Sequence, residues 1–143
     1  MPHSYVSNFG IVDFTAASLT LNDGGHAGQT VVSNLAGAQT VTLPAATGTG
    51  NLYRLFVKTT KTGDLVISCA GSDVMNGVVT VSTDAAGVAI LAAAANNTLT
   101  MNGSTTGGVQ GSHVELQDVA SGVWRVSGGL VSTGTEATPF STV

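Results

Sequence analysis

The stretch Leu99–Val131, LTMNGSTTGGVQGSHVELQDVASGVWRVSGGLV, decides the predicted fold of this 143-residue chain. Residues His113–Val119 alternate polar and apolar side chains, and Val123–Ser127 follow after a short turn that contains Gly122. Two strand-like runs joined by a glycine-bearing turn are typical of a β-hairpin. The hairpin carries Trp124, the only tryptophan, which we expect in the core because buried aromatic side chains dominate core energetics.

The chain before this hairpin consists of short runs rich in Val, Thr, Leu and Ile, separated by turns rich in Gly, Asn and Asp. Strands are expected at Ser18–Leu21, Thr30–Ser33, Gln39–Leu43, Leu52–Lys58, Asp64–Ala70, Val78–Ser82, Val88–Ala95 and Thr98–Met101. Alanines in Val88–Ala95 favour a helix, but the run is too short for a stable one and lies among strands. Asp73–Gly77 ends in Asn-Gly and is predicted to be a turn.

This pattern predicts an all-β fold, a single-domain sandwich or barrel of about ten short antiparallel strands with N- and C-terminal arms. Residues 1–23 are an N-terminal arm or the first strands, 24–131 are the β domain, and 132–143 are a C-terminal tail. We expect that tail to be mobile unless something binds it. No fixed period of about 20–50 residues stands out, so nothing indicates a solenoid or a propeller.

The N-terminal segment gathers apolar side chains that need cover, namely Tyr5, Phe9, Ile11, Val12 and Phe14. One hypothesis is that it contacts another subunit or a partner, since an extended arm can add a strand to an exposed sheet edge. The alternative, which the residues leave equally open, is that it forms the first strand of the domain's own sheet.

Composition limits the classes of function. Charged residues are only 8% of the chain, against about 25% in typical soluble domains. The 43% hydrophobic content argues against disorder. The surface of the folded domain must therefore consist mainly of Thr, Ser, Asn and Gly. Because this surface has so little charge, we expect much of it to contact other protein copies. With four basic residues and a net charge of −4, nucleic acid is not expected as a partner. No apolar run reaches the roughly 18 residues of a membrane span, and no membrane partner is expected.

Processing and redox signals are equally sparse. The N-terminus has no basic region followed by an apolar segment, so no signal peptide is predicted. The single Cys69 has no internal disulfide partner and is expected to be a small buried hydrophobe. These features indicate an origin in a reducing cytoplasm, or in a particle assembled there.

Motifs for catalysis or cofactor binding are not found. Most carboxylates stand beside turn residues, where turn chemistry is the commoner role than acid–base catalysis. His3, His26 and His113 have no metal-ligand spacing; Asp23 and His26 could share a metal, but a glycine-rich turn explains them better. Gly103–Gly108 lacks the Gly-Lys-Ser/Thr ending of a phosphate-binding loop. We therefore expect no enzyme activity, no catalytic residues, no metal and no cofactor.

Five segments carry a resemblance to a known group of proteins. They are Thr42–Val57, Asp73–Gly77, Met101–Gly108, Val114–Asp118 and Gly122–Val126. The chain from about Gln29 to Phe140 resembles small tailed-bacteriophage virion proteins of the capsid decoration, or cement, type. Similar segments occur in phage fibres.

This resemblance implies a structural virion protein, made in the host cytoplasm, that binds the outer surface of a phage head and stabilises it. Its partner would be the major capsid protein, and the protein would be a homotrimer at local three-fold positions. The apolar residues of the N-terminal segment would then make capsid or subunit contacts. The alternative is a head- or tail-fibre module that binds host-surface glycans through exposed loops, and a small hydrolase is the most distant interpretation.

Overall fold

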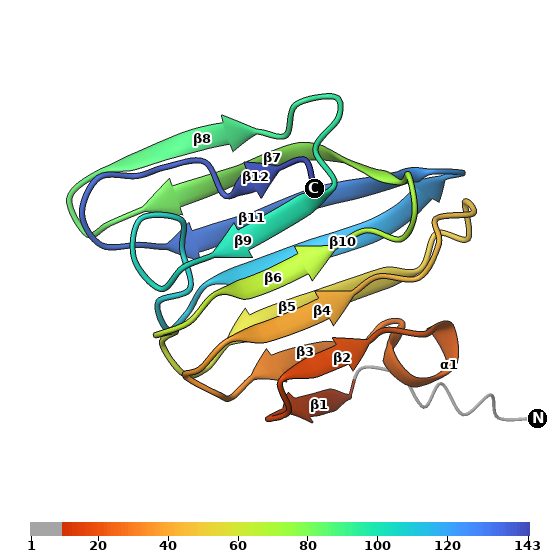
Figure 1. The fold of residues 1–143 in the computed structure, drawn as a ribbon, viewed down its shortest axis with the longest axis horizontal. Helices are drawn as coiled ribbons and strands as arrows, with labels where there is room; N and C mark the ends of the chain where they lie inside the picture. Colours follow the sequence, from red (N-terminus) through yellow and green to blue (C-terminus); the bar gives the residue numbers. More distant parts are fainter. Residues whose placement is uncertain (1–9) are drawn as a thin grey trace, which may run out of the picture.

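The computed structural model describes residues 10–143, in which two β-sheets lie face to face with one short helical turn beside them (Figure 1). The strands are β1 Ile11–Phe14, β2 Ser18–Thr20, β3 Thr30–Ser33, β4 Gln39–Thr42, β5 Leu52–Val57, β6 Leu65–Ser68, β7 Val74–Ser82, β8 Gly87–Leu91, β9 Thr98–Met101, β10 His113–Ala120, β11 Val123–Val131 and β12 Phe140–Ser141. The helical turn α1 is Asp23–His26. The sheet orders are β1-β3-β5-β10-β11-β7-β8 and β12-β9-β6-β4-β2. The prediction of an all-β sandwich is confirmed.

The prediction that the strands are antiparallel is wrong, because both sheets are mixed. The pairings β1–β3, β3–β5, β2–β4, β4–β6 and β7–β11 are parallel. From β1 to β6, successive strands alternate between the two sheets, so the chain winds as a coil and each strand lies beside the one two places earlier (Figure 1). A strand reached after a full turn runs parallel to its neighbour. Polar and apolar side chains alternate in the same way in parallel and antiparallel strands, so the sequence could not reveal the relative direction of the strands.

The turns of this coil differ in length, which explains why no repeat is visible in the sequence. Ile11 lies opposite Thr30, and Thr30 lies opposite Arg54, so these two turns span 19 and 24 residues. In the other sheet Ser18 lies opposite Thr40, 22 residues later. A fixed period requires equal loops, whereas here only the strand segments correspond.

The second half of the chain closes the coil with hairpins. The β10–β11 hairpin forms as predicted, with an irregular register after Asp118. The predicted turn at Asp73–Gly77 is wrong, because β7 runs straight through Asn76 and Gly77 beside β11. Gly77 has a φ of +142°, and a Cβ there would lie 1.9 Å from the carbonyl oxygen of Val126. Gly77 therefore allows the backbones of β7 and β11 to approach closely, and it does not form a turn.

The C-terminal segment departs from the expected tail. Phe140 and Ser141 form β12, which pairs antiparallel with β9, and the Phe140 side chain is buried in the core. Of the run Val88–Ala95, only residues up to Leu91 are in strand β8.

The core lies between the inner faces of the two sheets. Trp124 is fully buried there, as predicted, and its ring meets Tyr53 edge-on at a centroid distance of 5.7 Å. The largest fully buried side chains come from both halves of the chain, with Tyr53, Leu55, Leu65 and Ile67 from the coil and Met75, Leu99, Met101 and Trp124 from the strands that follow it. Side chains that alternate between core and solvent along each strand are what a two-sheet sandwich requires.

Candidate functional site

The residues predicted to contact a partner fall at different depths. Tyr5 and Phe9 lie outside the described residues. Ile11 is 69% exposed, Val12 is partly buried against the core, and Phe14 is only 3% exposed within it. For Ile11–Phe14 the structure shows the alternative interpretation, since β1 pairs with β3 at the edge of the domain's own sheet. Contact with a capsid or another subunit stays a prediction for this segment, and Ile11 offers the most exposed apolar surface in it.

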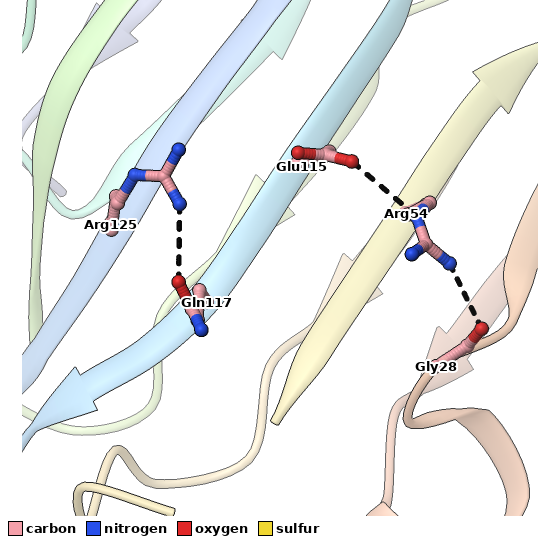
Figure 2. A network of polar contacts seen from close by, with 5 residues as sticks. All are labelled: Gly28, Arg54, Glu115, Gln117 and Arg125. Atoms are coloured by element: carbon pink, nitrogen blue, oxygen red, sulfur yellow. Dashed lines mark hydrogen bonds and ion pairs between the residues drawn. The ribbon is translucent and has the colours of Figure 1, made fainter. Parts of the chain in front are cut away.

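The outer face of the seven-stranded sheet carries charged side chains that are bonded to polar groups of neighbouring strands and of a loop (Figure 2). Arg54 on β5 lies opposite Glu115 on β10, with 3.4 Å between Nε and Oε1, and also donates to the carbonyl oxygen of Gly28 at 3.0 Å. Arg125 on β11 donates to Gln117 on β10 at 3.1 Å. Exposed pairs of this kind contribute at most about 1 kcal/mol each. They link neighbouring strands and occupy both arginines of the chain.

The outer face of the five-stranded sheet is different, because it carries hydroxyl groups and no charge. Its outward positions form two rows by register, Ser18–Thr40–Val66–Thr100 and Thr20–Thr42–Ser68–Thr98–Ser141. We call these nine residues the hydroxyl face, since eight of them are Ser or Thr; Thr98 alone among them is already buried, at 4% exposed. Between them Val41, Ile67 and Leu99 point into the core. Threonine suits these positions because its branched side chain packs well on a pleated sheet.

A buried carboxylate holds the long loop over residues 44–51. Asp118, at the irregular end of β10, accepts hydrogen bonds from the backbone N–H groups of Thr47, Gly48 and Thr49 at 2.7–3.1 Å and from the Thr49 hydroxyl at 2.8 Å. Burial alone would raise the pKa of Asp118, but these four hydrogen bonds outweigh it and hold the pKa below its ordinary value. Sequence analysis assigned Asp118 to a turn and did not predict that its carboxylate anchors a loop about 70 residues away.

A second buried polar group closes one end of the sandwich. The side chain of Lys61 is 3% exposed and donates to the carbonyl oxygen of Leu35 and to Oε1 of Gln39. Gln39 in turn donates to the carbonyl oxygens of Phe14 and Ala16. Burial lowers the pKa of Lys61. Sequence analysis missed this network, because Lys61 follows Thr59 and Thr60 in a segment predicted to be a polar turn. The only signal of a buried polar group was Gln39 at the start of an apolar strand.

The residues that suggested a metal or reactive group have structural partners. Asp23 accepts a hydrogen bond from the Tyr53 hydroxyl, and Nδ1 of His26 accepts one from the backbone N–H of Asn22 at 3.0 Å. Burial first, and then Asp73 nearby, raise the pKa of the Cys69 thiol to about 12. Within residues 10–143 there is no group of three or more metal-ligating side chains, and no pocket was found there.

In comparisons with known proteins, no family model matches the chain, and no curated protein matches it significantly. In the described part of the chain, no helix is long and apolar enough to cross a membrane.

Proposed function

We propose that this chain is a structural virion protein that binds the outer surface of a phage head, with its hydroxyl face toward the major capsid protein. The observation that carries the proposal is the hydroxyl face, a complete outer sheet face without Asp, Glu, Lys or Arg. The central parts of protein–protein interfaces are depleted of charged residues in the same way. The resemblance of the sequence to capsid decoration proteins supplies the partner.

The cost of desolvation favours this face over the opposite one. Covering the seven-stranded sheet would remove water from Asp13, Arg54, Glu115 and Arg125, and burying a charge is costly unless it is well paired. Covering the hydroxyl face removes water from neutral groups, each of which can exchange its hydrogen bonds with a partner backbone. Short side chains in two rows also let a flat partner surface approach closely.

The basic side chains support a protein partner over nucleic acid. Lys61 is buried, and both arginines are bonded on the seven-stranded sheet. Binding to phosphates requires several basic groups that release counterions together. The homotrimer and the virion location that the resemblance implies stay part of this proposal.

The test is binding of purified protein to phage heads that lack it, measured by co-sedimentation. Thr40→Lys places a charge on the exposed part of the hydroxyl face, and Thr80→Lys places the same charge on exposed β7 of the other sheet. We expect Thr40→Lys to weaken binding at least about tenfold, because a charge is then desolvated, and Thr80→Lys to bind as the wild type does.

Two outcomes would contradict the proposal. Equal binding by both variants would exclude the hydroxyl face as the contact. Failure of the wild-type protein to bind heads would exclude decoration, and binding to host cells in its place would favour the fibre module. In a particle map, density at many symmetric capsid positions is the expected result.

A further inference from the structure

Strand β8 ends the seven-stranded sheet with an edge that carries no protection against pairing (Figure 1). It reads Gly87-Val88-Ala89-Ile90-Leu91, without charge or proline, and Val88 and Leu91 are 43% and 69% exposed. Natural proteins usually protect such edges with charged residues, prolines or bulges, because free backbone groups are a template for another strand. The opposite edge of the same sheet, β1, carries Asp13.

The hydrogen-bond pattern shows which backbone groups face the open side. At one end of the β7–β8 ladder Ala92 donates to Gly77, and at the other end Thr83 donates to Ala86. In an antiparallel pair, hydrogen-bonded and non-hydrogen-bonded residue pairs alternate. Val88 and Ile90 therefore bond to β7, and Gly87, Ala89 and Leu91 direct their N–H and C=O groups away from it. No described strand lies beyond them.

This edge is complementary to itself. If two copies of β8 run antiparallel about Ala89, each Ala89 lies opposite its counterpart and each Gly87 lies opposite a Leu91. All three outward-facing residues then exchange backbone hydrogen bonds, and each Leu91 side chain packs over a glycine. On the core side, each Val88 meets the Ile90 of the other copy. Asp84, in the turn before β8, stays apart from its counterpart because the two lie at opposite ends of the paired strands.

We propose that the β8 edge is a self-association surface, on which a second copy of this chain binds β8 to β8 about a two-fold axis at Ala89. The two seven-stranded sheets join into one continuous sheet across this contact. The inference is independent of capsid binding. It predicts a dimer of the free protein in solution, whereas the trimer that the resemblance to decoration proteins implies is one at local three-fold positions of the phage head.

The first test is the mass of the free protein, measured by light scattering over about a hundredfold range of concentration. We expect the wild type to reach twice the chain mass of 14.2 kDa. Leu91→Lys should stay monomeric, because a lysine on an edge strand opposes pairing. The matched control is Val119→Lys, at a residue that is 46% exposed at the end of β10, separated from the β8 edge by β11 and β7, and this variant should still dimerise.

Several results would overturn the proposal. These are a wild type that is monomeric or trimeric throughout, an equal effect of both lysine variants, and loss of the dimer on removal of residues 1–9. The last result would show that the N-terminal segment joins the copies. Melting temperatures of the variants establish that each is folded.

The second test reads the register. In a Cys69→Ser background, Ala89→Cys should form a disulfide-linked dimer on mild oxidation, since directly opposed Cα atoms lie about 5.5 Å apart. Val88→Cys should not, because the two sites are diagonal and about 7–8 Å apart. Equal crosslinking of both variants, or none of Ala89→Cys, would exclude this two-fold register.

Discussion

The two halves of the chain build the same sandwich by different means. Strands β1–β6 form a coil in which each strand lies parallel to the one two places earlier, and a buried polar network around Gln39 and Lys61 closes its end. Strands β7–β12 contain two hairpins, β7–β8 and β10–β11, and contribute Trp124, the largest side chain of the core. The coil contains loops of different length, and the second half contains the close backbone approach of Gly77 on β7 to Val126 on β11. The predictions below test this difference.

Replacement of Trp124 should have the largest effect. Trp124→Ala is expected to lower the free energy of unfolding by about 3–5 kcal/mol, as for other large aromatic residues removed from cores. The measurement is urea denaturation followed by circular dichroism. Trp124→Phe is the control and should cost much less, since the indole Nε1 has no hydrogen-bond partner among the described residues. An alanine variant that keeps its melting temperature but no longer binds heads would show that Trp124 is an exposed anchor.

A methyl group at Gly77 should have the next largest effect, because it tests the close approach of β7 to β11 in the second half of the chain. Gly77→Ala is expected to cost about 3 kcal/mol, because the Cβ would overlap the Val126 carbonyl oxygen and force β7 and β11 apart. Gly37→Ala, in the coil half, is the matched control, since nothing lies within 4 Å of its Cβ position. Thermal denaturation of both variants measures the difference. Similar losses at the two sites would contradict a specific close approach of β7 to β11 at Gly77.

Asp118 connects the halves, because its carboxylate on β10 holds the loop between β4 and β5. Asp118→Asn should cost about 2 kcal/mol, since a charged acceptor of four hydrogen bonds is replaced by a neutral one. The lowered pKa of Asp118 gives a pH signature. Its stabilisation is present above the ordinary aspartate pKa of about 3.9 and is lost as the pH falls through the folded-state pKa. Denaturation midpoints below pH about 4 should fall less steeply for Asp118→Asn than for the wild type.

Lys61 should give the smallest effect and the opposite pH dependence. Because burial lowers its pKa, the unfolded chain binds more protons than the folded one at alkaline pH. Stability should therefore rise with pH between the lowered folded-state pKa and the ordinary lysine value of about 10.4. Lys61→Met should lack this rise and change stability at neutral pH by only about 1 kcal/mol, because removal of a buried ammonium group offsets the loss of its hydrogen bonds to Leu35 and Gln39. Identical alkaline profiles would mean that Lys61 does not titrate in this range.

The candidate surfaces were predictable to different degrees. The alternation in Thr40–Thr42 and Thr98–Thr100 shows that hydroxyls occupy one side of each strand, but only the register places them in shared rows. The sequence did not predict that β8 is an edge strand, because its alanine-rich run fits a helix, a core strand or an edge strand equally well. Asp118 and Lys61 became significant only once distant loops lay beside them, and the sequence pattern has no means of signalling such contacts.

The sequence by itself determined the all-β class, the position of most strands and the burial of Trp124, because these follow from local alternation of side chains and from turn residues. Only the tertiary structure decided strand direction, the passage of β7 through Asn76 and Gly77, and the docking of Phe140 against β9. The physical reason is that the residues of a strand themselves determine which of its two faces is buried and which is exposed. Its neighbours are chosen by loop paths and by backbone contacts between segments far apart in the chain.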